Sequence, residues 1–173
     1  MSDPYNRVGG AAPLARSSRT PLPGAAPCKV TRPAEMLTTT DLIGFDVAWI
    51  AVDAAGFVAI FTNAGEAPIP ESAEYAVFAT EELVLDLPEI SEIQLHADVP
   101  RPDSFVAFAK RGLFSYDWSD AHRTASLFGG YELMARPDRP LSVEELPSIL
   151  QAYALATRLN DAKFGAAVVV VPS

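Results

Sequence analysis

Residues 46–62, with the sequence DVAWIAVDAAGFVAIFT, decide the fold class of this 173-residue chain. Two apolar runs, Val47–Val52 and Phe57–Phe61, are rich in β-branched and aromatic residues, which fit the pleated and packed surface of a sheet. Between them lies the break Asp53–Gly56, where glycine can adopt a positive φ angle without a steric penalty from Cβ. The stretch therefore predicts a β-hairpin, and with it an antiparallel sheet.

The patterning beyond the hairpin predicts further strands and helices. Strands are predicted at 113–118, 131–135 and 164–171, and helices at 71–86, 103–111 and 142–160. The last helix begins with a capping box, Ser142–Glu145, and the final strand is apolar on both faces. Residues 89–98 fit either a strand or a helix. The fold class is therefore α+β: a mainly antiparallel sheet, including the hairpin at 46–62, packed against two to three helices.

The helix predicted at 71–86 rests on a recurring apolar pattern. Tyr75, Phe78, Ala79 and Leu83 roughly follow one helical stripe. Glutamates occupy its first turn, where they favour the positive end of the helix dipole. The pattern and the charges agree on a helix here.

Residues 1–35 differ from the rest of the chain in composition. They contain six prolines, three glycines and few large apolar side chains, so they bury too little surface to offset the entropy of ordering. We expect this Pro-, Gly- and Arg-rich segment to be disordered and residues 36–173 to form a single globular α+β domain. Because globular patterning begins just after Met36, a second hypothesis is that Met36, and not Met1, is the biological start.

Charge is divided unevenly along the chain. Residues 1–36 hold five basic and two acidic side chains, a net of +3, whereas the remainder holds eight basic and twenty acidic ones, a net of −12. A body this acidic repels nucleic-acid phosphates and attracts basic proteins; a simpler interpretation is that the acidic surface keeps the protein soluble. No apolar run reaches the roughly 18–20 residues of a membrane span. The expected partner is a basic protein, not nucleic acid or a membrane.

One cluster mixes the residue types that bind metal ions. Asp117, Asp120 and His122 offer two carboxylates and an imidazole and, together with the loop 63–70, could form a metal or small-molecule site of an enzyme. Their spacing matches no helical i, i+4 pair, which favours a solvated loop instead. The single cysteine, Cys28, excludes an intrachain disulfide, and the sequence has no G-x-S-x-G or phosphate-loop motif. No cofactor is predicted.

Three aromatic residues on predicted strands are candidates for the core. Trp49 lies in a strongly apolar strand. Tyr116 and Trp118 share one face of their strand, because strand side chains alternate. An exposed pair ringed by acids would anchor a basic partner, but a half-buried strand must cover one face, which favours burial of both.

Several stretches resemble small bacterial proteins akin to the immunity proteins of polymorphic toxin systems. The resemblance covers roughly residues 45–150 and rests on Trp49–Thr62, Gly65, Pro68–Pro70, Phe114–Trp118, Tyr131–Pro137 and Pro140–Pro147. It implies a cytoplasmic protein that inhibits a toxin by tight binding. The family pattern contains no catalytic residues that could be assigned to positions of this chain. If the toxin is a basic nuclease, complementary charge would speed association.

The leading interpretation is thus a non-enzymatic acidic domain that binds a basic protein. The predicted contact residues are Glu74, Glu81, Glu82, Asp86, Glu89, Glu92 and Trp118. The rival from another class is the metal or small-molecule site described above. A third alternative is self-association, with the strand at 164–171 as an edge that pairs between chains.

Overall fold

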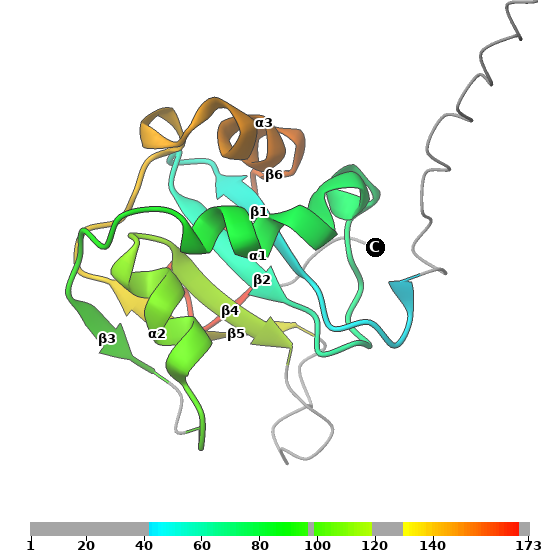
Figure 1. Ribbon diagram of the computed structural model, residues 1–173, viewed down its shortest axis with the longest axis horizontal. Helices are drawn as coiled ribbons and strands as arrows, with labels where there is room; N and C mark the ends of the chain where they lie inside the picture. The colour runs from blue at the N-terminus through cyan, green and yellow to red at the C-terminus, as the bar shows by residue number, and fades with distance from the viewer. Residues whose placement is uncertain (1–41, 97–98, 119–129, 170–173) are drawn as a thin grey trace, which may run out of the picture. The chain divides into compact units, whose positions relative to one another are not determined.

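The computed structural model describes residues 42–96, 99–118 and 130–169, all within the unit Glu35–Ser173 (Figure 1). The predictions for residues 1–35 and for Met36 lie outside these ranges. The strands are β1 (Ala48–Asp53), β2 (Val58–Thr62), β3 (Ile93–Leu95), β4 (Phe114–Trp118), β5 (Tyr131–Pro137), β6 (Arg158–Leu159) and β7 (Val168–Val169). The helices are α1 (Val77–Leu85), α2 (Asp103–Lys110) and α3 (Ser148–Ala156), with 3-10 helices η2 (Glu71–Ala76) and η4 (Val143–Glu145).

The strands form one seven-stranded sheet in the order β3-β5-β4-β2-β1-β6, with β7 also paired to β5. The hairpin is confirmed: β1 and β2 are antiparallel, with Trp49 opposite Phe61. The sheet is mixed, however, because β2 pairs with β4 and β1 with β6 in parallel. Between β2 and β4 the chain passes through α1 and α2, a crossover of the kind that parallel neighbours require.

The three α-helices cover one face of the sheet, as Figure 1 shows for α1 and α2 in front of the strands. On this face the alternate residues Ile50 of β1 and Ile60 of β2 join one apolar core with helix side chains. The helices contribute Val84, Phe108 and Leu150. The α+β class and the helices packed on a sheet therefore agree with the expectation from sequence.

The opposite face carries an aromatic core. Trp49 stacks on Phe61 with ring centroids 4.2 Å apart, and Phe61 stacks on Tyr116 at 5.1 Å. The Tyr131 hydroxyl accepts the Trp49 indole N–H at 3.2 Å and donates to the Pro68 carbonyl at 3.0 Å. Trp49 and Tyr116 are fully buried, which confirms both as core residues. Their polar atoms are buried together with hydrogen-bond partners, as stability requires.

The helix predicted at 142–160 is shorter and interrupted. Its capping box is present, with the Ser142 N–H donating to the Glu145 carboxylate at 2.9 Å, but it opens only η4. Leu146 is extended, with φ −74° and ψ 148°, because Pro147 disfavours helical geometry in the residue before it. Only after Pro147 does α3 begin, and it ends before β6.

Two further predictions are corrected at the ends of the sheet. Of the strand predicted at 164–171, the described residues contain only the short β7, extended by a bond from the Leu133 N–H to the Ala167 carbonyl at 2.8 Å. Ala166 and Ala167 are exposed. The segment is therefore not buried on both faces, and 170–173 lie outside the described ranges. The ambiguous residues 89–98 contain the short strand β3.

Tyr116 should make the protein sensitive to high pH. Its hydroxyl donates to the Ala166 carbonyl at 3.0 Å, and burial raises the pKa of Tyr116 to about 12, with the nearby Asp53 charge adding to the shift. The neutral phenol is thus favoured by folding, so stability is intact below about pH 10 and is lost toward pH 12. We expect Tyr116 to lower the free energy of unfolding by about 2 kcal/mol between pH 9 and 11.5, and the buried Tyr131, whose pKa is also raised, adds to the total fall.

Urea unfolding at both pH values measures this fall. The variant Tyr116→Phe should show a clearly shallower pH dependence, whereas an equal slope in both proteins would contradict the assignment.

Candidate protein-binding surface

Four aromatic side chains gather on the outer side of η2, α1 and α3. Tyr75 and Phe78 are 58% and 59% exposed, and Phe45 is 54% exposed. Phe78 meets Phe45 edge-on with ring centroids 6.3 Å apart, and Tyr75 meets Tyr153 edge-on at 5.3 Å. Because Tyr75 and Phe78 are three residues apart on consecutive helical turns, they are neighbours on one face. The two ring pairs, Phe45 with Phe78 and Tyr75 with Tyr153, are together called the aromatic surface.

Local sequence explains why these rings face outward. Apart from Glu74, the buried residues of η2 and α1 have short side chains, namely Ala73, Ala76, Val77, Thr80 and Val84. The Thr80 hydroxyl donates to the Ala76 carbonyl at 2.9 Å, so it is satisfied in its buried position. The apolar stripe that contains Tyr75 and Phe78 is therefore not the buried face. Large apolar side chains clustered in solvent are uncommon and mark interaction sites.

Exposed acids accompany the aromatic surface. They are Asp46, Glu71, Glu81, Glu82 and Asp86. Glu82 lies four residues after Phe78 in α1, which places it beside that ring on the same helical row. Glu71 opens the 3-10 helix η2 that carries Tyr75. The sequence has no lysine or arginine between Arg32 and Arg101. The surface consequently presents aromatic rings within a negative field.

Beside the aromatic surface lies a polar hollow of about 300 Å³, which we call the acidic hollow. Its lining includes Asp46, Thr62, Glu81, Ser104, Phe105 and Asp117. The Thr62 hydroxyl donates to the Asp117 carboxylate, which holds that side chain in place. Asp46 and Glu81 also belong to the acids around the aromatic surface, so the two features are continuous. The carboxylates and the ring suit a guanidinium or ammonium group.

The predicted acidic contact residues do not all reach this surface. Glu81, Glu82 and Asp86 are exposed on α1 or at its end. Glu74 is buried, with 8% exposure, so it cannot contact a partner directly. Glu92 is exposed but lies next to β3, away from η2 in the sequence and in the fold.

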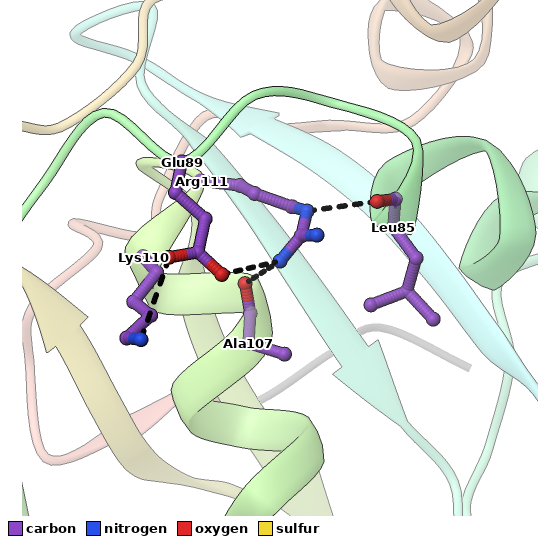
Figure 2. Close-up of polar contacts among 5 residues, drawn as sticks. All are labelled: Leu85, Glu89, Ala107, Lys110 and Arg111. Carbon is purple, nitrogen blue, oxygen red and sulfur yellow. Dashed lines mark hydrogen bonds and ion pairs between the residues drawn. The ribbon is translucent and has the colours of Figure 1, made fainter.

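Glu89 is exposed and forms ion pairs within the molecule, as Figure 2 shows. Its oxygens lie 3.4 Å from Lys110 Nζ and 3.7 Å from Arg111 Nη1. Arg111 also donates from Nε to the Leu85 carbonyl at 3.0 Å and from Nη1 to the Ala107 carbonyl at 2.8 Å. These carbonyls lie in the last turns of α1 and α2, where they lack partners within the helix. Arg111 thus joins both helix ends.

Replacing Arg111 should therefore destabilise the fold. Because its side chain is 15% exposed and donates to two terminal carbonyls, we expect Arg111→Met to lower the free energy of unfolding by about 2 kcal/mol. Methionine retains the apolar stem, so the loss reports the guanidinium. Urea denaturation measures it, with Lys110→Met as the control that removes only a half-exposed ion pair, worth about 0.5 kcal/mol. Equal effects in both variants would contradict this role.

The metal candidates are only partly described. Asp117 lies on β4 beside the acidic hollow, whereas Asp120 and His122 fall outside the described residues. In the loop 63–70, the Asn63 side-chain oxygen accepts the Val47 N–H at 2.8 Å, so the loop serves the fold itself. Within the described ranges, no three Asp, Glu, His or Cys side chains are placed to hold one metal ion.

Trp118 is half-buried, so it is neither a fully buried core residue nor a fully exposed anchor for a partner. Its ring meets Tyr131 edge-on at 5.3 Å and packs against the aromatic core. It therefore offers a partner far less surface than Tyr75 or Phe78.

A larger hollow, of about 700 Å³, is lined by residues 158–163 together with Ala166, Val168 and Val169. Its charged side chains, Arg158, Asp161 and Lys163, are exposed. Size alone does not identify a binding site, and the described residues that line this hollow include no aromatic ring. We therefore assign the candidate site to the aromatic surface and the acidic hollow.

Comparison with known proteins finds no relative of this chain. No protein-family model, no curated protein and no solved structure gives a significant match to the chain. Among the helices of the described residues, none has both the length and the apolar character needed to cross a membrane.

Proposed function

We propose that this protein is a non-enzymatic binding domain whose aromatic surface and acidic hollow take a basic protein partner. The observation that carries the proposal is the cluster of three rings more than half exposed, Phe45, Tyr75 and Phe78, beside exposed carboxylates. Aromatic residues that become buried on binding supply much of the affinity of protein interfaces. The carboxylates raise the association rate and select a positive partner.

The acidic hollow gives the proposal a specific contact. A lysine or arginine side chain of the partner would enter between Asp46, Glu81 and Asp117, where charge-assisted hydrogen bonds are strong. The neighbouring rings would then cover the apolar stem of that side chain. Affinity and charge selection thus come from adjacent parts of one surface.

The proposed role is that of an immunity-type inhibitor, which acts in the cytoplasm by covering a basic toxin. This part rests on the sequence resemblance and on the acidic body with its net charge of −12 after residue 36. A basic nuclease would be a suitable target, because its nucleic-acid site is itself positive and complementary to the acidic surface.

Charge reversal on α1 tests the proposal. We expect Glu81→Lys with Glu82→Lys to slow association with the basic partner about tenfold at low salt and to flatten its salt dependence, because both carboxylates lie in the steering field. The partner is the basic protein captured from a lysate of the native host, and stopped-flow fluorescence measures the rate.

The matched control is Glu144→Lys with Asp161→Lys, which changes the net charge equally at exposed positions outside the candidate site. If both pairs of substitutions slowed association alike, net charge alone would explain the effect and the surface assignment would be wrong.

The second candidate function, a metal or small-molecule site at the loop 63–70 with Asp117, Asp120 and His122, is favoured only by the polarity of the acidic hollow. The Thr62 hydroxyl already donates a hydrogen bond to one oxygen of the Asp117 carboxylate, which leaves that oxygen less available to a metal ion or ligand. Elemental analysis together with a thermal melt, with and without chelator, separates the two functions: stoichiometric metal and a lowered Tm would support the second.

A further inference from the structure

Strand β3 leaves one edge open in the described part of the sheet. Its residues pair with β5 on one side, with Gln94 opposite Arg136, and no described strand lies on its other side. Figure 1 shows β3 at the border of the sheet. Leu95 is 46% exposed there. An unpaired strand with exposed apolar residues is a template for another strand.

The hydrogen bonds with β5 show which backbone groups face outward. The Asp138 N–H donates to the Glu92 carbonyl, and the His96 N–H donates to the Met134 carbonyl, both at 2.9 Å. Because bonding direction alternates along a strand, the N–H and C=O groups of Ile93 and Leu95 point away from β5. The edge therefore presents two donors and two acceptors.

We propose that β3 pairs with β3 of a second copy of this chain, antiparallel and centred on Gln94. In this register Ile93 of each copy lies opposite Leu95 of the other, and each such pair exchanges two N–H to carbonyl bonds. All the outward backbone groups of both strands are then satisfied. This dimer is independent of the partner-binding function and uses a different surface.

Side-chain chemistry favours the same register. With Gln94 opposite itself, Glu92 lies opposite His96 of the second copy, twice per dimer. Both side chains are exposed in the single chain, and a carboxylate accepts a hydrogen bond from an imidazole N–H. Cross-strand pairs of this kind stabilise a sheet, and like pairs destabilise it. A shift of the register by one residue would lose both pairs.

Sedimentation equilibrium of the full chain, over a range of concentrations, tests the dimer. Glu92→His places two imidazoles opposite each other, and His96→Glu places two carboxylates opposite each other. We expect each single change to raise the dimer dissociation constant about tenfold. The double variant Glu92→His/His96→Glu restores both complementary pairs and should return the constant to within about threefold of wild type.

Circular dichroism checks that each variant is folded. The proposal is overturned if the wild-type protein stays monomeric at every concentration, or if the double variant is no tighter than the single ones. Leu95→Pro removes one outward N–H per copy and should also dissociate the dimer. Partner binding through the aromatic surface is measured separately, so either proposal can fail alone.

Discussion

Asp53→Ala should lower the free energy of unfolding by about 3–5 kcal/mol. Asp53 ends β1 and is 3% exposed. One carboxylate oxygen accepts the N–H groups of Ala55 and Phe57, each at 3.0 Å, and the other accepts the N–H of Phe164 at 3.0 Å. Alanine leaves all three donors without this acceptor: the buried Phe164 N–H then costs about 1–3 kcal/mol, and the two part-buried bonds of the turn add to the loss.

The same carboxylate joins two distant parts of the chain. Its first oxygen shapes the hairpin turn, and its second holds Phe164, which packs against the aromatic core. Asp53→Asn keeps the oxygen for the turn but faces the Phe164 N–H with another donor, so it should cost about 2 kcal/mol. Urea denaturation measures both variants. The exposed Asp161→Ala is the control, and an Asp53→Ala protein as stable as that control would refute the network.

Tyr75→Ala with Phe78→Ala should weaken binding of the basic partner at least about 100-fold. Aromatic side chains at the centre of an interface often contribute 2 kcal/mol or more each when truncated. The same change should leave stability within about 1 kcal/mol, because both rings are more than half exposed and alanine favours the helix. Isothermal titration calorimetry with the purified partner measures the affinity.

A matched control comes from another exposed apolar residue. Leu95 on β3 is 46% exposed and lies outside the aromatic surface. Leu95→Ala should leave the affinity for the partner unchanged. If the double variant bound as tightly as Leu95→Ala, the rings would be ordinary surface residues and the proposed interface would be elsewhere.

The hairpin and its core tryptophan were predictable because their signals are local. The runs that became β1 and β2 alternate between two buried faces, and Gly56 adopts φ 85° at the turn. The break after η4 was also readable in principle, since Pro147 restricts Leu146. At this position Pro147 outweighs the capping box Ser142–Glu145, which begins only the single 3-10 turn η4.

The sequence does not predict the aromatic surface, because large apolar residues at helical spacing usually mark the buried face of a helix. A sequence signal did exist: Ala73, Ala76, Val77, Thr80 and Val84 also follow helical spacing. Two apolar stripes on one helix leave one exposed, and tertiary packing decides which. Here the short side chains lie against the sheet.

Other features depend on contacts between distant residues, which no local pattern encodes. The parallel pairing of β2 with β4 and the ion pairs of Glu89 with Lys110 and Arg111 are of this kind. Glu89 is a surface acid, as the sequence predicts, but it is paired with two basic side chains, whereas Glu74 is buried. Glu81 and Glu82 are exposed, as the sequence predicts.

Hydrogen exchange of the complex with the basic partner tests the central claim most directly. If the aromatic surface and the acidic hollow form the interface, amides of η2 and α1, together with the turn around Phe45, should exchange more slowly in the complex than in the free protein. Protection confined to β3 or to residues 158–169, with η2 and α1 unchanged, would contradict the account.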